Sequence, residues 1–256
     1  MKEITFDHIY NPGHEIGENE LYKHIHFPEM LTRYDSNFLK FKKHPTLAEF
    51  KEAALFLREF HQSKGQKHVK FLFPDDHKPS EELMDYFKDE GYETGFNELY
   101  LIEPGQFPIL EDIPDIEVRE VTEAELNAYL AFQYEQDLEY GPDFADQKVD
   151  MHKRNFQNPR LVQLLAFYKG TPAGSVDVII EDHTAEIDGL MVHEMFQKKG
   201  IGARLQQFVM KQFPDKTVIL VADGEDTPRL MYRKQNYRCL GFRYEVQKVY
   251  ETEQPE

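Results

Sequence analysis

The sequence predicts an α/β protein built on a mixed sheet, and three observations carry this prediction. Short apolar runs typical of strands alternate with segments whose apolar residues recur at helical spacing. Two strands at 161–168 and 172–181 are joined by Lys169-Gly170, a turn typical of antiparallel pairing. The stretch 187–205 predicts a buried strand, a short loop and a helix opened by two glycines. Antiparallel turns and strand–helix crossovers in one chain indicate a sheet of mixed direction.

Composition limits the class of protein. The 256 residues exceed the usual size of one domain, so we expect two. A hydrophobic content of 40%, with 20 Phe and 14 Tyr, excludes a disordered chain. The apolar runs are too short to cross a bilayer and the first residues lack the apolar core of a signal peptide, so we expect a cytoplasmic protein without membrane association. The lone Cys239 excludes an internal disulfide framework and a cysteine zinc cluster.

The chain is strongly acidic, with a formal net charge of −17. This charge opposes binding to nucleic acid and to anionic membranes over most of the surface. It suits a cationic substrate such as an amine, although acidity also serves solubility alone. A ligand that carries phosphates would need a local basic patch. The candidates for that patch are Lys198, Lys199, Arg204, Arg229, Arg233 and Lys234.

The first half of the chain begins with a weak pattern and then gives clear signals. Residues 1 to about 45 predict no definite element. Thr46 and Glu49 are spaced as a capping box, and Gly65 ends the helix that they open. Ser80 caps a second helix, which stops at Gly91. We expect strands at 68–73 and 98–102.

Three prolines and a glycine at 104–114 predict the linker between the domains. We therefore divide the chain into domains at 1–108 and 109–256. In the second domain we expect strands at 116–121, 161–168, 172–181, 185–192, 218–222 and 243–249, and helices that begin near residues 122, 147, 200 and 227.

The loop before the helix at residue 200 has the features of an anion site. Gly200 and Gly202 let the backbone approach a ligand closely, and the first turn of a helix leaves N–H groups without acceptors. These N–H groups and the positive end of the helix dipole favour phosphate, and Lys198 and Lys199 add charge. The loop matches neither the Walker pattern nor the three-glycine dinucleotide pattern. The alternative is an ordinary corner whose glycines serve packing.

The loop sequence QKKGIGA resembles the R/Q-x-x-G-x-G/A signature of the GNAT acetyltransferases, in which this loop holds the pyrophosphate of acetyl-CoA. A second family motif, Y-x-x-x-G-F, is similar to the segment at 222–237. There Tyr232 takes the tyrosine position, and Asn236-Tyr237 stand in place of Gly-Phe. This departure is mild, because Asn tolerates the left-handed conformation that ends helices. The resemblance covers 116–249 and implies the GNAT acyl-CoA N-acyltransferase fold.

The first half resembles a degenerate copy of the second. The segment 86–92 is similar to 231–237 when Gly91 is aligned with Asn236, which places Phe87 where Tyr232 stands. No Q/R-x-x-G-x-G signature precedes Leu110. We therefore expect two tandem units, of which the N-terminal one is GNAT-like but degenerate and lacks a CoA site.

The resemblance also implies a set of residues that bind acetyl-CoA, with no metal. Backbone groups of Leu190, Met191 and Val192 would pair with the pantetheine arm, and the N–H of Leu190 would meet the thioester oxygen. The loop residues implied at the pyrophosphate are Gln197, Lys198, Lys199, Gly200, Ile201, Gly202, Ala203 and Arg204.

Two side chains are the catalytic candidates. Tyr232 would donate a proton to the departing sulfur, and the alternative is an aromatic residue that fills the core. Glu186 occupies the strand position where some family members carry their general base. Asp188 and Glu181 are rivals, a water chain is a further alternative, and each carboxylate could simply lie on a solvated strand face. His183 and His193 lack partners at metal-ligand spacing and fit surface loops.

The resemblance implies an N-acetyltransferase that moves the acetyl group of acetyl-CoA directly to a primary amine of a small molecule or an aminoacyl group. The alternatives are a non-catalytic acyl-CoA-binding protein with a decayed site and an acyltransferase that uses a longer acyl-CoA. The oligomeric state stays open, with a homodimer as one form. Residues that could bind an ammonium group, or merely form a solvated loop, are Tyr134, Asp137, Tyr140 and Asp143.

Overall fold

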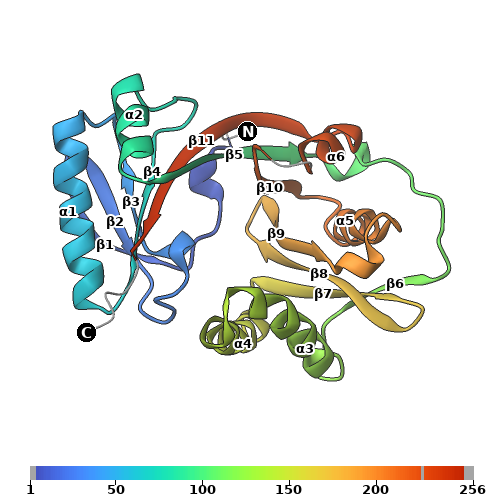
Figure 1. The fold of residues 1–256 in the computed structure, drawn as a ribbon. Coiled ribbons are helices and arrows are strands. Elements are labelled where there is room, and N and C mark those ends of the chain that lie inside the picture. Colours follow the sequence, from blue (N-terminus) through green and yellow to red (C-terminus); the bar gives the residue numbers. More distant parts are fainter. Residues whose placement is uncertain (1–3, 226–227, 251–256) are drawn as a thin grey trace. The chain divides into compact units, whose positions relative to one another are not determined.

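The computed structural model describes residues 4–225 and 228–250, with the backbone alone at 228–230. The chain forms two compact units (Figure 1). Unit 1 comprises Met1–Leu99, Ala222–Arg229 and Leu240–Glu256, and unit 2 comprises Tyr100–Val221 and Leu230–Cys239. The prediction that 1–108 and 109–256 fold as domains stays a prediction.

Unit 1 is a sheet covered by two helices. Its strand order is β1-β2-β3-β4-β11-β5, in which β3 and β4 are parallel while β1–β2, β2–β3 and β4–β11 are antiparallel. The strands are β1 (His14–Glu18), β2 (Tyr22–His26), β3 (Phe38–Phe41), β4 (His68–Leu72), β5 (Glu93–Ile102) and β11 (Arg238–Val249). The helices are α1 (Leu47–Ser63) and α2 (Glu81–Asp89), with 3₁₀ turns η1 (Phe6–His8) and η2 (Tyr34–Ser36).

Both helices begin at the caps that the sequence predicts. The Thr46 hydroxyl accepts from the backbone N–H of Glu49 at 3.2 Å, and the Glu49 carboxylate accepts from the Thr46 N–H at 2.8 Å. Ser80 accepts from the N–H of Leu83 at 3.3 Å. These bonds satisfy N–H groups that a helix leaves without acceptors at its start. The expected capping box at the start of α1 and the expected cap of α2 are therefore confirmed.

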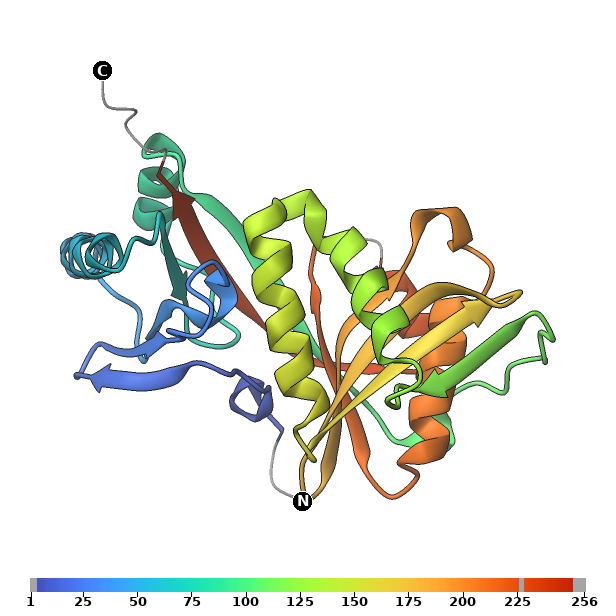
Figure 2. The same cartoon turned by 90° about the horizontal axis from the view of Figure 1, so that it is seen from below.

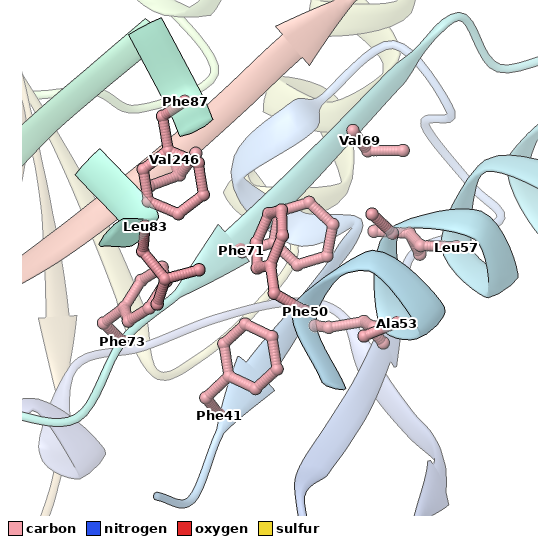
Figure 3. Packing of buried hydrophobic residues seen from close by; sticks show 12 residues of the cluster. Phe41, Phe50, Ala53, Leu57, Val69, Phe71, Phe73, Leu83, Phe87 and Val246 are labelled. Atoms are coloured by element: carbon pink, nitrogen blue, oxygen red, sulfur yellow. The ribbon is translucent and has the colours of Figure 1, made fainter. Parts of the chain in front are cut away.

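Phenylalanine rings make the core of unit 1, where α1 and α2 pack on one face of the sheet (Figure 3). The Phe50 ring from α1 lies 4.8 Å from those of both Phe71 on β4 and Phe87 on α2, between ring centroids. All three side chains are fully buried. Edge-to-face and tilted rings at such distances add to the stability gained from burial alone.

The structure places three strands before residue 45, in the stretch where the sequence predicts no definite element. In β1 all five residues are exposed, so this strand has no alternation of apolar and polar residues by which the sequence could predict it. The strand is held instead by the backbone ladder to β2 and by ion pairs such as Lys23–Glu15 at 2.9 Å. Charged side chains on such an edge also discourage pairing with other chains.

Unit 2 holds a mixed sheet with the order β10-β9-β8-β7-β6, which confirms the predicted fold class. β6–β7, β7–β8 and β8–β9 are antiparallel, and β9–β10 is parallel. The strands are β6 (Ile116–Glu120), β7 (Leu161–Tyr168), β8 (Thr171–Ile180), β9 (Thr184–Val192) and β10 (Thr217–Asp223). The helices are α3 (Leu126–Asp137), α4 (Pro142–Phe156), α5 (Ile201–Gln212) and α6 (Pro228–Lys234), with 3₁₀ turns η3 (Pro104–Gln106), η4 (Leu138–Tyr140) and η5 (Glu194–Phe196).

Helices cover both faces of the unit 2 sheet, with α3 and α4 on one face and α5 on the other (Figures 1 and 2). Tyr129 and Phe132 of α3 pack against Leu165 on β7. On the opposite face α5 approaches β8 at Gly174, where an added Cβ would lie 3.1 Å from Ile201 and 2.7 Å from the carbonyl oxygen of Met191. This glycine therefore sets how closely α5 can approach the sheet.

None of the helices among residues 4–225 and 228–250 is both long and apolar enough to cross a membrane.

Four histidines are buried in unit 1, namely His24, His26, His61 and His68. His61 Nδ1 lies 2.6 Å from the carbonyl oxygen of His68, and His68 Nε2 lies 3.1 Å from that of Asn37. The second ring nitrogen of each of these two histidines has no hydrogen-bond partner among the described residues. Burial opposes their charged forms, so it lowers the pKa to about 4 for His24 and His61 and to about 3 for His68.

We expect acid to destabilise the fold between about pH 6.5 and 4. Unfolded histidines take up protons near pH 6.5, whereas the folded ones do so only near pH 4, so the unfolded state binds more protons in this window. The free energy of unfolding should fall by roughly 2–5 kcal/mol from pH 7 to pH 4.5, measured by urea unfolding. His24→Phe should flatten this dependence and the exposed His183→Gln should not. An equal slope in both variants would contradict the assignment.

Replacing Gly174 should loosen the contact between α5 and the sheet. Gly174→Ala places a Cβ against a backbone oxygen that cannot rotate away, so we expect a loss of about 1–3 kcal/mol in the free energy of unfolding. Gly105→Ala is the matched control, because its Cβ meets nothing within 4 Å. The control should change stability by less than about 0.5 kcal/mol. Similar unfolding curves for the two variants would argue against the close approach.

Candidate functional site

Strand β9 contains a β-bulge near its C-terminal end. Ser175 pairs with Met191 and Asp177 pairs with Asp188, so two steps along β8 correspond to three along β9. The extra residue falls at Gly189, whose φ of 60° lies in the left-handed region. Such a bulge bends the strand and removes backbone groups from the ladder.

The other edge of β9 separates from β10 at nearly the same point. The parallel register runs from Thr184 opposite Thr217 to Ile187 opposite Leu220, and among the described residues it goes no further. The backbone of 188–192 therefore has an edge that this ladder does not use. N–H and C=O groups on such an edge need hydrogen-bond partners. The predicted pantetheine residues Leu190, Met191 and Val192 lie on this edge and are half-buried.

The glycine loop follows directly and leads into α5. Gly200 has a φ of 89° and occupies the position before the first helical residue, and no side chain caps this helix. Lys198 also lies in the left-handed region, with a φ of 61°. The amide of Gln197 donates to the carbonyl oxygen of Val192 at 3.4 Å, which ties the loop to the end of β9. The first-turn N–H groups of α5, which include those of Ile201, Gly202 and Ala203, thus lie beside the free edge of β9.

Packing does not require a glycine at position 202. A Cβ added there would meet only Val192 Cγ2, at an ordinary 3.6 Å, and φ is not in the left-handed region. Gly200 is different, because its conformation favours glycine. The alternative that both glycines serve only a packed corner therefore does not account for Gly202.

The predicted basic patch is partly neutralised. Arg204 lies 3.7 Å from Asp112 and donates to Gln207 at 2.8 Å, and its side chain is largely buried. The Lys199 ammonium lies 5.3 Å from the centre of the Tyr168 ring. Lys198, Arg233 and Lys234 are exposed, whereas the side chain of Arg229 lies outside the described residues. Lys198 and Lys199 are therefore the basic side chains that lie within the glycine loop and are exposed there.

Tyr232 on α6 is buried between two other tyrosines. Its ring lies 5.4 Å from that of Tyr100 and 5.3 Å from that of Tyr237, between centroids. Burial raises its pKa to about 12, so the hydroxyl keeps its proton at neutral pH. Tyr237 in turn donates to Gln206 of α5 at 2.8 Å, which links the end of α6 to that helix.

The carboxylates proposed as bases lie in different surroundings. Glu186 is buried on β9 and pairs across the sheet with Ile179. Asp188 is exposed and stands directly opposite Asp177. Glu181 is exposed and bonds to Arg160 at 3.0 Å, on the surface at the end of β8. Glu186 and Asp188 share a strand face because they are two residues apart.

A buried polar cluster lies on that face and was missed in the sequence. The Tyr129 hydroxyl donates to Asp177 at 2.5 Å and accepts from the amide of Gln133 at 2.8 Å. His152 Nδ1 lies 3.2 Å from the same hydroxyl and 3.9 Å from the Asp177 carboxylate. His152 Nε2 lies 3.9 Å from Asp137, so two helices and one strand contribute to this cluster. Desolvation raises the pKa of Asp177 to about 6.

The residues suggested for an ammonium site differ in exposure, and Tyr134 on α3 is half-buried. Asp137 is buried beside His152, whereas Tyr140 is 68% exposed and packs on Phe144 at 5.2 Å. Asp143 is exposed at the start of α4. The part of the chain that the structure describes contains no group of three His, Cys, Asp or Glu side chains arranged to hold a metal ion.

Two family models match the chain. Residues 124–237 match the acetyltransferase (GNAT) family, and residues 4–100 match a domain of unknown function, DUF5613. None of the curated proteins matches the chain.

Solved structures extend the likeness over the whole chain. A functionally unknown conserved protein from Staphylococcus epidermidis ATCC 12228 is 31% identical, with a TM-score of 0.89 over 97% of this chain and 99% of that one. A GCN5-related N-acetyltransferase from Sphaerobacter thermophilus is 17% identical, with a TM-score of 0.64 over 91% of this chain and 82% of that one. A tandem GNAT protein from the clavulanic acid biosynthesis pathway is 9% identical, with a TM-score of 0.53 over 85% and 76%.

These matches agree with the geometry of the site. A bulged strand that leaves its parallel neighbour, an uncapped helix behind a glycine loop and a buried tyrosine on α6 occur within the segment that matches the GNAT model. Residues 124–237 of the chain form a GNAT acetyltransferase domain, and the N-terminal unit, which matches DUF5613, fits a degenerate GNAT-like copy.

Proposed function

We propose that this protein transfers the acetyl group of acetyl-CoA to a primary amine of a small molecule or of an aminoacyl group. The match of residues 124–237 to the acetyltransferase (GNAT) family supports an acyl-CoA-dependent acyltransferase. The observation that supports the proposal best is the edge of β9 beyond Ile187, which is free of the β10 ladder and adjoins the glycine loop. An extended ligand arm can pair with such an edge as an added strand would.

Acetyl-CoA would lie along β9 and over the start of α5. Backbone groups of 190–192 would bond to the pantetheine arm, and the N–H of Leu190 would polarise the thioester carbonyl. First-turn N–H groups of α5 and the lysines before Gly200 would hold the pyrophosphate, which carries negative charge that the helix dipole favours. Gln197 and Arg204 would fix the two ends of this loop through their bonds to Val192 and Gln207.

The transfer would proceed by direct attack within a complex of both substrates. The neutral amine nitrogen attacks the thioester carbon, and the carbonyl electron pair moves to oxygen beside the N–H of Leu190. When the intermediate collapses, the C–S bond breaks and the thiolate takes the hydroxyl proton of Tyr232. Tyr232 can supply this proton because burial keeps it protonated at neutral pH. Glu186, Asp188 and Asp177 are the carboxylates on the strand face from which a base would act.

A carboxylate placed in the loop should abolish acetyl-CoA binding. Gly202→Glu brings a negative charge to the proposed pyrophosphate site, whereas Gly202→Ala adds only a methyl group with room to fit. By calorimetry we expect micromolar binding for wild type and for Gly202→Ala, and at least about a hundredfold loss for Gly202→Glu. Thermal unfolding of each variant checks that the fold survives. Equal binding by all three would place the cofactor elsewhere, and no binding by wild type would contradict the proposal.

Removing the Tyr232 hydroxyl should slow the reaction without weakening acetyl-CoA binding. Tyr232→Phe keeps the ring between its tyrosine neighbours but removes the proton that the thiolate needs. We expect kcat to fall by about 10²-fold or more in a thiol-release assay over a panel of amines. A kcat that stays at the wild-type value would exclude Tyr232 as the proton donor. Binding of acetyl-CoA with no turnover by wild type on any amine would favour a non-catalytic acyl-CoA-binding protein.

A further inference from the structure

A row of polar residues crosses the sheet of unit 2 directly beside the β9 bulge. Gln163 on β7 pairs with Asp177 on β8, which pairs with Asp188 on β9. Directly opposed residues point to the same face. This is the face that α3 and α4 cover, as the bond from Gln163 to the carbonyl oxygen of His152 at 3.3 Å indicates. One end of the row, Gln163, is buried, and the other, Asp188, is exposed.

Two oxygens flanking Asp177 lack hydrogen-bond partners among the described residues. They are the hydroxyl of Ser175 and the side-chain oxygen of Gln163. Both side chains are at least 98% buried. Ser175 lies two residues from Asp177 and so shares its strand face. Buried polar atoms almost always form hydrogen bonds with protein, water or a ligand. These two oxygens therefore indicate that a water molecule or a polar ligand group binds beside Asp177.

The charged groups around Asp177 come from each element packed against it. Tyr129 on α3 donates a hydrogen bond to the Asp177 carboxylate, and His152 on α4 lies 3.9 Å from the same carboxylate. Asp188 stands opposite Asp177 on β9. Asp188 raises the pKa of Asp177, whereas Lys148 and the hydrogen bonds from Tyr129 and Asn155 lower it. Desolvation outweighs these contributions and raises the pKa of Asp177 to about 6, and this carboxyl lies next to the exposed carboxylate of Asp188. Paired carboxylates in contrasting surroundings are typical of acid–base sites.

We propose that Asp177, held by Tyr129 and His152, accepts the proton of the attacking amine, and that Asp188 draws the cationic acceptor to it. This inference rests on the proposed function, and it assigns Asp177 as the general base of the proposed acetyl transfer. It also defines the acceptor class as a cationic primary amine that enters at the exposed end of the row.

The position of the bulge favours Asp177 over Glu186. Asp177 stands opposite Asp188, the residue before Gly189, where β9 bulges away from β8 and has just passed the end of its ladder to β10. Glu186 pairs with Ile179 on one side and with Ile219 on the other, inside the part of β9 that is still laddered on both edges. An amine that attacks a thioester at Leu190 is therefore nearer along the strand to Asp188 and Asp177.

The protons balance in this scheme. The acceptor enters as an ammonium ion, R–NH3⁺, and loses one proton to water to give the neutral nucleophile. As the C–N bond forms, the nitrogen becomes acidic and gives its next proton to the Asp177 carboxylate. The C–S bond then breaks and the thiolate takes the Tyr232 proton. Asp177 passes its proton through solvent to the tyrosinate, which restores both groups and leaves an amide and a free thiol.

The first experiment removes the proposed base while keeping its shape. Asp177→Asn should lower kcat/KM by about 10²-fold or more and abolish the decline of wild-type activity below about pH 6. Asp188→Asn should raise KM for cationic amines about tenfold with little change in kcat. Glu186→Gln tests the rival base, and the exposed Asp182→Asn is the matched control. Wild-type kcat/KM and pH profile in Asp177→Asn would overturn the inference, as would loss of the acidic limb in Glu186→Gln instead.

A second variant separates proton transfer from structure. The Tyr129 hydroxyl bonds to the charged form of Asp177 and lowers its pKa, so Tyr129→Phe should raise that pKa. Because the base works only when ionised, the acidic limb of kcat/KM should move to higher pH by about one unit. Tyr22→Phe in unit 1 is the control and should not move it. A limb at the wild-type pH in Tyr129→Phe would overturn the inference even if the activity fell.

Acetyl-CoA calorimetry on the same variants separates the two proposals. All variants should bind acetyl-CoA within about twofold of wild type, because Asp177 and Asp188 do not belong to the proposed CoA contacts. Binding and amine turnover by wild type, with Asp177→Asn unaffected, would overturn the inference and leave the proposed function intact. No acetyl-CoA binding and no turnover by wild type would overturn both.

Discussion

The site depends on the register of one strand. β9 must match β8 over its whole length, yet it carries an extra residue at Gly189, and its parallel ladder to β10 ends at Ile187. Any residue with a side chain would resist the left-handed conformation that this bulge requires. The bulge thus creates a stretch of backbone that lies within a sheet but has N–H and C=O groups that the sheet does not pair. A folded protein can keep such an edge only if a ligand or water completes its hydrogen bonds.

Helix α5 and the polar cluster lie on opposite faces of the same three strands, and each constrains them differently. On the α5 face, an added Cβ at Gly174 would lie 2.7 Å from the carbonyl oxygen of Met191 on β9 and 3.1 Å from Ile201 on α5, so this glycine permits the close packing of α5 on the two strands. On the other face, the Tyr129 hydroxyl links α3 to Asp177 by a short hydrogen bond, and the Gln133 amide of the same helix donates to that hydroxyl. A buried carboxylate is costly unless its hydrogen bonds are satisfied. The fold therefore maintains a charge-bearing group where an apolar residue would pack more simply, and this favours a functional reason for it.

The sequence was informative where local chemistry decides structure. The Thr46 capping box and the glycine loop that leads into α5 could be predicted because each signal is contained in a few consecutive residues. The strands before residue 45 could not, because exposed polar strands such as β1 carry no apolar alternation. Asp177 was missed for another reason. Its partners Tyr129 and His152 lie on separate helices, and only the antiparallel register of β8 and β9 places Asp177 opposite Asp188.

The order in which the chain is made has a consequence for unit 1. β11 lies between β4 and β5 in its sheet, and Val249 at the end of β11 pairs with His68 at the start of β4. On the ribosome, Phe71 and the rest of β4 are complete long before their partner strand exists. At about 5–20 residues per second, the wait lasts on the order of 10–30 s. During that time a strand whose residues are mostly buried in the folded protein has an open edge, which is a template for pairing with another nascent chain.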